Sequence, residues 1–384
     1  MCLLIKTKLA IMALEIKEVV TKKEYKTFIY LPEKIHKGHE SWLPPIYFDE
    51  KKFFNPNKNL SFRGCDYKML LAYKDGEAVG RIMGIINNQH NQVTGLKNAR
   101  FGYFECYNDP EVSHALISEI EKWGREKGMT KIVGPFGFTD RDIQGVLIEG
   151  FEYEPVVDSA TNYEFLPKLI EKEGFTKELD CVIYRFPLTT ELPPIYQKVY
   201  ERVTSKKDIQ FREYTSKKLL NEPLILAVLR MVNESFKDIY GFMPMDDKEM
   251  LDLAKRYLPI LDPRFVKIVT KGDEVIAFLV SMPNLYKGIQ KSKGRLLPFG
   301  IFHILKAMKT AKSVNTMLGA VAPAFQKQGL DIFLSMTTIA SAKKAGMTSI
   351  DTHVVMEDNN DMMAEMKRYG AFLLKKFRVY QKPL

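Results

Sequence analysis

Cysteine is scarce in this chain of 384 residues, and long apolar runs are missing. The four cysteines, Cys2, Cys65, Cys106 and Cys181, form no CxxC pair, which argues against a zinc site and against a disulfide framework. Such cysteine usage fits a reducing cytoplasm, the localisation that we expect. No stretch approaches the ~20 apolar residues of a membrane-spanning helix, so we expect no membrane span.

Clusters of basic residues are also missing, although the chain is basic. Lys and Arg number 57 against 47 Asp and Glu, which gives a formal net charge of +10. That excess suits an anionic ligand such as a nucleotide, and it would equally suit RNA, DNA or a membrane surface. No run of five basic residues occurs, so nucleic-acid binding is disfavoured and a solvated basic surface is the simpler interpretation.

The N-terminus lacks the features of a signal peptide. Residues 1–14 are apolar but carry Lys6 and Lys8, and they contain no small-residue cleavage site. Met12 is an alternative start codon. A second apolar stretch, 301–308, has lysines within and after it, which predicts an amphipathic surface helix rather than a membrane anchor.

A faint internal repeat divides the chain into two halves. Residues 72–84 and 269–281 each predict a β-hairpin, with turn signals at Asp75-Gly76 and at Gly272-Asp273. Later in each half, a predicted helix ends before the same Gly-Met-Thr triplet, at 128–130 and at 346–348, and a strand follows.

Each half therefore predicts the order strand, helices, hairpin, strand, helix, strand, helix, strand. The strand–helix–strand unit implies a parallel pair and the hairpins imply antiparallel neighbours, so the fold class is mixed α/β with helices on the sheet faces. We assign an N-terminal domain to residues 14–187, a linker to 188–207 and a C-terminal domain to 208–384. A short helix is expected at 195–203 inside the linker.

The segment VNTMLGAVAPAFQKQGLDIFLSM, which begins at Val314, resembles the acyl-CoA motif of the Gcn5-related N-acetyltransferase (GNAT) superfamily. Gln326, Gly329 and Asp331 stand at the three marked positions of that motif. The whole chain resembles bacterial tandem GNAT proteins, which implies two GNAT-like domains. Physically, backbone amides in a turn before a helix N-terminus suit a pyrophosphate, and Gly329 would allow its close approach. The candidate CoA-binding residues are Ala320, Val321, Ala322, Gln326, Lys327, Gln328, Gly329, Leu330 and Asn360.

Two departures from the family pattern weaken this resemblance. Asp331 replaces the usual Gly or Ala, and its carboxylate would compete with a phosphate unless it points to solvent. In the N-terminal copy Asp109 and Pro110 look like the N-cap and first residue of a helix, and Glu111 adds a second acid. We therefore expect the N-terminal domain to bind no CoA and to act as scaffold or acceptor-binding surface.

Acyl transfer to an amine requires a base, a group that polarises the thioester carbonyl and an acid for the leaving thiolate. His353, on a predicted strand with Asp351, is a candidate base by residue type, although a lone strand histidine is more often structural. Glu357 at the end of this strand is a comparable candidate for the base. The tyrosine that the family often uses as the acid is replaced by Met366, and Tyr369 is the nearest alternative or a core residue.

The sequence thus predicts an acyl-CoA-dependent N-acyltransferase, with acetyl-CoA or another acyl-CoA as cosubstrate and a small-molecule or peptide amine as acceptor in the interdomain cleft. A catalytically inactive GNAT-fold binding protein is the alternative. We expect no metal, because the HxxH at His36 and His39 has no further ligands nearby in the sequence. Asn359 or Asn360 resembles the family asparagine that contacts pantetheine, and either would also serve as a helix N-cap.

Overall fold

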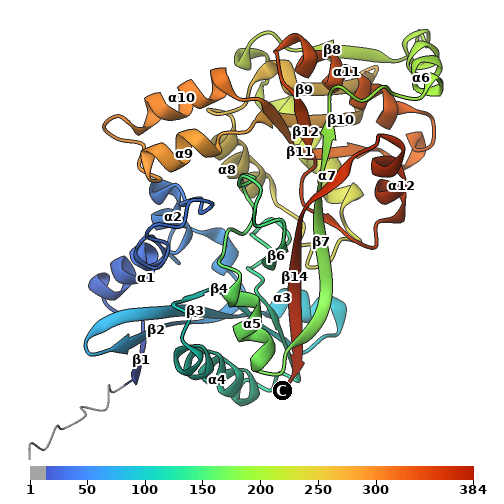
Figure 1. Ribbon diagram of the computed structural model, residues 1–384. Coiled ribbons are helices and arrows are strands. Elements are labelled where there is room, and N and C mark those ends of the chain that lie inside the picture. The colour runs from blue at the N-terminus through green and yellow to red at the C-terminus, as the bar shows by residue number, and fades with distance from the viewer. Residues whose placement is uncertain (1–13) are drawn as a thin grey trace, which may run out of the picture.

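The computed structural model describes residues 14–384 (Figure 1). The prediction that the N-terminus is not a signal peptide, and the alternative start codon at Met12, concern the segment outside these residues. The N-terminal half follows the predicted order of elements, with one additional helix, α3, and one additional strand, β6. Its elements are β1 (Leu14–Glu18), α1 (Lys22–Ile35), α2 (Tyr47–Phe53), β2 (Cys65–Lys74), β3 (Glu77–Asn87), α3 (Asn88–Thr94), β4 (Asn98–Cys106), α4 (Pro110–Glu126), β5 (Lys131–Gly134), β6 (Val146–Glu149), α5 (Phe165–Lys172) and β7 (Thr176–Pro187).

The C-terminal half repeats that order and inserts two helices, α9 and α10, between its hairpin and its next strand. The expected linker helix is α6 (Pro194–Thr204). The remaining elements are β8 (Gln210–Glu213), α7 (Glu222–Ser235), α8 (Asp247–Tyr257), β9 (Val266–Lys271), β10 (Glu274–Pro283), α9 (Tyr286–Ser292), α10 (Gly300–Thr310), β11 (Ser313–Val321), α11 (Leu330–Lys344), β12 (Ser349–Asp351), β13 (Val355–Met356), α12 (Asn360–Arg368) and β14 (Phe372–Pro383).

Local turn chemistry explains the repeated elements. Asp75 and Gly76 both have positive φ, 50° and 80°, and they close the β2–β3 hairpin. Gly128 and Gly346 lie just after α4 and α11 with φ of 74° and 72°, the left-handed conformation that ends a helix. The parallel pairs predicted from the strand–helix–strand units are β4–β5 and β11–β12.

One continuous mixed sheet joins the two halves, in the order β1-β2-β3-β4-β5-β14-β7-β12-β11-β10-β9-β8. The two halves exchange their last strands: β14 lies between β5 and β7, and β7 pairs with β12 (Figure 1). The linker at residues 188–207 therefore separates two halves of the sequence, whereas the sheet continues through both halves.

Buried ion pairs hold the exchanged strands together. Arg185 on β7 donates two hydrogen bonds to Asp351 on β12, at 2.6 and 2.8 Å, and the Asp351 side chain is fully buried. Arg378 on β14 bonds Asp180 on β7 at 2.8 and 2.9 Å. Burial alone would raise the pKa of Asp180, but the bonds and charges of Arg378 and Lys177 outweigh it and lower this pKa to about 2.

Candidate active site

The strand–turn–helix that carries the motif forms as predicted. β11 ends at Val321, a short 3₁₀ turn covers Pro323–Phe325, and α11 begins at Leu330 with Gly329 as its N-cap. Lys327 and Gly329 both have positive φ, 59° and 88°, which bends the chain sharply between the strand and the helix.

Free backbone amides gather in this turn. Within residues 14–384, the N–H groups of Lys327 to Asp331 donate to no protein acceptor. The first amides of a helix have no partner inside the helix, and together with its positive end they form a site for an anion. Lys206 approaches the same turn, with its Nζ 3.3 Å from the Gln328 side-chain oxygen. The turn therefore offers donors and positive charge to a phosphate.

One glycine in this turn is also constrained by packing. A Cβ on Gly329 would lie 2.5 Å from a methyl group of Val199 on α6. Glycine is therefore required here for its φ and for the packing of α6. That it also allows a phosphate to approach closely stays a prediction. Asp331, the departure from the family pattern, is exposed in the first turn of α11.

The strand before the turn has an open edge. β11 pairs with β12 only from Ser313 to Asn315, whereas it pairs with β10 along almost its whole length. Its register against β10 shifts at Val280/Ser281, which leaves Met317 as an extra, bulged residue. Beyond Asn315 the backbone groups on the side of β11 away from β10 face no neighbouring strand, whereas the Ala322 amide, just after β11, donates to the Ile276 carbonyl at 2.9 Å. That edge can hold an extended ligand by main-chain hydrogen bonds.

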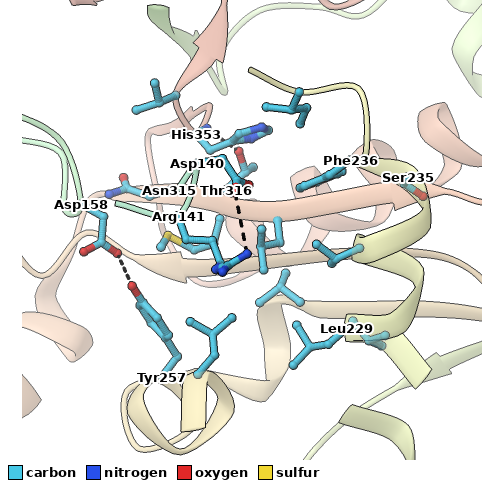
Figure 2. Close-up of a pocket in the computed structure, with 18 of the residues that line it drawn as sticks. Asp140, Arg141, Asp158, Leu229, Ser235, Phe236, Tyr257, Asn315, Thr316 and His353 are labelled. Carbon is cyan, nitrogen blue, oxygen red and sulfur yellow. Dashed lines mark hydrogen bonds and ion pairs between the residues drawn. The ribbon is translucent and has the colours of Figure 1, made fainter. Parts of the chain in front are cut away.

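A cavity of about 590 Å³ lies between this half of the sheet and α7 and α8. Its volume is in the range of small-molecule sites, roughly 300–1,000 Å³. Most of its wall is apolar, and Figure 2 shows Leu229 and Tyr257 at one end of the view and His353 at the other. Its aliphatic wall includes Leu220, Leu224, Ile225, Val228, Leu229, Val232, Leu253, Ala254, Leu258, Val266, Ile268, Val280 and Leu318.

Polar groups concentrate where β11 and β12 separate. The Thr316 hydroxyl accepts the His353 amide at 2.9 Å, and it lies 3.4 Å from the Asp351 carbonyl. Asn315 is 1% exposed and lines the cavity, yet neither its Oδ1 nor its Nδ2 has a partner in the described chain. A buried amide without partners is costly, so this geometry favours a polar ligand atom beside Asn315.

His353 lines the same end of the cavity. It does not lie on a strand as predicted, because β12 ends at Asp351, where the chain diverges from β11 and the ladder stops. Its Nδ1 is buried and unpaired within the described residues. Burial lowers the pKa of His353 to about 4, so the imidazole is neutral near pH 7 and has a free nitrogen that can accept a proton.

The N-terminal half contributes a loop to this cavity. Asp140 and Arg141 line it, and they also hold the segment between α7 and α8. Arg141 donates to the Met243 carbonyl at 2.6 Å, and the Asp140 amide donates to the Gly241 carbonyl at 3.2 Å. Burial raises the pKa of Asp140. The site is therefore built from both halves of the chain.

A smaller cavity of about 270 Å³ adjoins the first and is lined mainly by the N-terminal half. The two cavities share Val157, Asp158 and Tyr257 as lining residues. The Tyr257 hydroxyl donates to Asp158 at 3.0 Å, and Asp158 has a φ of 62° (Figure 2). Burial raises the pKa of Asp158. This pair stands where the two cavities meet.

Of the predicted site residues, only His353 lines the larger cavity. The residues predicted at 320–322 and 326–330 are not part of its wall, and neither are Glu357, Tyr369 and Asn360. Glu357 pairs with Lys177 and Lys376 at 2.8 and 2.7 Å, and these bonds lower its pKa. Tyr369 is 4% exposed and packs in a core with Phe186 and Tyr196.

Asn360 is exposed at the first position of α12. Its neighbour Asn359 lines the cavity and caps α12, accepting the Met362 amide at 3.1 Å. Of the two asparagines considered for pantetheine contact, Asn359 is therefore the one that lies at the cavity.

Sequence reasoning missed the apolar wall of the larger cavity and the Asp140–Arg141 loop. The available signal was the sequence of α7, EPLILAVLRMVNES, which is apolar over most of its circumference. Such a helix has too much apolar surface for one packed face, and here the excess lines the cavity.

The two histidines of the HxxH motif pack against neighbouring side chains of the N-terminal half. His36 stacks on Trp42, lies 2.9 Å from His39 and bonds Glu105 at 2.9 Å. Among residues 14–384, no cluster of three or more histidine, cysteine or acidic side chains is arranged to hold a metal ion.

No protein-family model matches the chain. It is 28% identical over 373 residues to a bacterial ceramide synthase from Caulobacter vibrioides, covering 95% of this chain and 96% of that protein. It is 24% identical over 376 residues to the protein YghO of Escherichia coli, covering 96% and 95%. Among solved structures, a tandem GNAT protein from the clavulanic acid biosynthesis pathway superimposes with a TM-score of 0.55 at 9% identity, covering 97% of this chain and 98% of that one. The chain thus has the tandem GNAT fold.

Proposed function

We propose that this protein is an acyl-CoA-dependent N-acyltransferase that joins a fatty acyl group to the amine of a long-chain amino alcohol. The observation that carries the proposal is the large apolar cavity beside the open edge of β11. Each methylene group that leaves water contributes about 0.8 kcal/mol, so an alkyl chain in this cavity would bind strongly. The likeness to a bacterial ceramide synthase supports the same substrate class, since a ceramide is the N-acyl derivative of a long-chain amino alcohol.

The turn before α11 would hold the CoA phosphates, with Lys327 and Lys206 adding positive charge to the free amides. The open edge of β11, at 320–322, would bind the pantetheine by main-chain hydrogen bonds. Amides of the same edge would polarise the thioester carbonyl, the role of an oxyanion site.

His353 would act as the base. The neutral amine attacks the thioester carbon, so that a C–N bond forms, the C–S bond breaks and CoA leaves as a thiolate. The proton that the amine loses is finally taken up by this thiolate, which gives the free thiol of CoA. The neutral imidazole of His353 has its Nδ1 free to accept that proton at the polar end of the cavity. Asn315 would orient the amine or its neighbouring hydroxyl, which would satisfy the unpaired amide.

The test measures amide product by mass spectrometry, with acetyl-, octanoyl- and palmitoyl-CoA as donors. The acceptors are sphinganine and the short amino alcohol ethanolamine. We expect product with sphinganine and a long-chain donor, and little with ethanolamine. Binding of the acyl-CoAs without product would support the alternative, a non-catalytic binding protein.

A matched pair of substitutions on β10 tests whether the cavity holds an alkyl chain. Val280 lines the cavity, whereas Val275 on the same strand does not. Val280→Phe should lower kcat/KM for the long-chain pair by about tenfold or more, because the ring displaces several methylene groups. Val275→Phe should change it much less. Equal effects of the two substitutions would remove the cavity from the proposal.

A further inference from the structure

The inserted helices α9 and α10 carry an exposed group of large apolar side chains, which we call the apolar tip. It consists of Leu297 and Phe299 in the loop and Phe302 and Leu305 on α10, which are 81, 70, 63 and 44% exposed. The opposite face of α10 is buried, with Ile304 packing against the core that includes Ile289 and Leu285. Large side chains so exposed on adjoining turns mark an interaction surface.

The apolar tip is anchored to the N-terminal half. The Tyr47 amide of α2 donates to the Gly294 carbonyl at 3.0 Å, and Arg295 pairs with Glu33 of α1 at 2.8 Å. Figure 1 shows α9 beside α2, with α10 packed next to α9. Phe48, the residue after Tyr47, is itself 73% exposed.

The charge of the segment that carries the tip has one sign. No acidic residue occurs between Glu274 and Asp331, while that segment holds eight basic residues. The exposed lysines Lys291, Lys293, Lys306 and Lys309 lie on the helices and loop that carry the tip. The basic excess of this one segment, +8, is most of the +10 of the whole chain. The basic residues of the segment are Lys287, Lys291, Lys293, Arg295, Lys306, Lys309, Lys312 and Lys327.

We propose that the apolar tip docks this protein on the surface of an anionic phospholipid bilayer. Exposed aromatic and aliphatic side chains surrounded by lysines are the features of an interfacial membrane-binding surface. The apolar groups enter the headgroup–acyl boundary while the lysines remain at the lipid phosphates. Within residues 14–384 no helix is sufficiently long and apolar to cross a bilayer, and docking on its surface requires none.

The charge also decides between possible occupants. A second copy of the chain placed on the tip would bring two lysine-rich surfaces together, at a cost in like-charge repulsion. An anionic bilayer satisfies the apolar and the basic parts of the surface at once. The tip also lies outside the wall of the smaller cavity, to which Leu285 and Ile289 contribute from the other side.

The experiment is co-sedimentation of the full chain with vesicles, in the absence of any substrate. The vesicles are phosphatidylcholine alone or phosphatidylcholine mixed with phosphatidylglycerol. We expect the wild type to bind the anionic vesicles at least about tenfold more tightly and to be released by high salt. Because no substrate is present, the result is independent of the proposed acyltransferase activity.

Paired variants identify the surface. Phe299→Ser with Phe302→Ser should lower binding to anionic vesicles by about tenfold or more. Val93→Ser with Ile195→Ser is the control, since these residues are 79 and 57% exposed on α3 and α6, away from the tip.

Lys306→Glu with Lys309→Glu should also lower binding at least about tenfold, because one lysine near an anionic surface contributes roughly fivefold. Its control is Lys22→Glu with Lys23→Glu in the first turn of α1.

Two outcomes would overturn the proposal. The first is equal binding of wild type and the Phe299/Phe302 variant to anionic vesicles, or no binding by either. The second is a change in molar mass by light scattering when the tip is mutated in the absence of lipid, because that would assign the tip to contact between copies of the chain.

Discussion

The helix that follows the parallel strand begins differently in the two halves of the chain. In the N-terminal half Asp109 caps α4, accepting the amides of Glu111 and Val112 at 3.0 and 3.4 Å. Lys74 pairs with both Asp109 and Glu111, at 2.6 and 2.7 Å. In the C-terminal half the N-cap of α11 is Gly329, which has no side chain, and the amides around it are free. The start of this helix therefore binds a carboxylate of the chain itself in the N-terminal half, whereas in the C-terminal half its free amides are available to an external anion.

This difference shows how a duplicated fold can divide its work. Both halves keep a bulged strand, with Tyr103 at a φ of 53° on β4 and Met317 in the bulge of β11. In the first half the carboxylate of Asp109 occupies amides at the start of α4, and this half contributes a wall and a loop to the joint cavity. A capping carboxylate is a small change in sequence, but it occupies the donors that a phosphate needs.

The largest expected effect comes from giving the C-terminal turn the charge of its N-terminal counterpart. Gln326→Glu with Gln328→Glu adds two carboxylates beside the free amides and changes the shape of the side chains very little. Repulsion between like charges costs several kcal/mol, so acyl-CoA affinity measured by calorimetry should fall at least about a hundredfold.

The reciprocal change is the control for this comparison. Asp109→Ala removes the cap of α4 and should lower the free energy of unfolding by about 1 kcal/mol, while acyl-CoA affinity stays within about twofold. If Asp109→Ala weakened acyl-CoA binding as strongly as the glutamine pair, the two helix ends would not differ in function.

A second comparison uses one histidine from each half. Burial lowers the pKa of His353 and of His90 to about 4, from an ordinary value of 6.5. Between these values the unfolded chain binds a proton that the folded chain does not, so stability falls as pH drops from about 6.5 to 4. His353→Gln and His90→Gln should each recover about 2 kcal/mol of this loss in denaturant titrations across that range.

The effect on kcat should distinguish the two histidines. If His353 is the base, His353→Gln should also lower kcat by about tenfold or more at neutral pH, whereas His90→Gln should leave kcat nearly unchanged. Loss of kcat in both variants would indicate that the effect is structural.

Local signals in the sequence predicted most of the elements but not how the halves join. Asp75-Gly76, the two Gly-Met-Thr triplets and the Asp109–Pro110 start of α4 each fix a turn or a helix end through their own backbone preferences. The exchange of β7 and β14 leaves no such trace, because alternation along a strand does not identify its neighbour.

The site was predictable only where it is contiguous in sequence. The turn at 326–330 formed as expected because a strand end, a positive φ and a helix start are local features. His353 was placed on a strand because its neighbours alternate, whereas the ladder ends where β12 diverges from β11. The cavity gathers residues from Asp140 to Asn359, and only the folded chain brings them together.

The smallest expected effect concerns two acids at the same position of their helices. Asp331 and Glu111 are each the second residue, of α11 and α4 respectively. Asp331→Asn should raise acyl-CoA affinity about threefold at low salt, because an exposed carboxylate weakly repels the phosphates and is screened by ions. It should also lower stability by about 0.5 kcal/mol, as the helix loses a favourable charge at its N-terminus. Glu111→Gln should show a loss of stability without the gain in affinity. If Asp331→Asn left affinity unchanged at low salt, the phosphates would have to bind away from the start of α11, and the contrast between the two helix ends would lose its functional meaning.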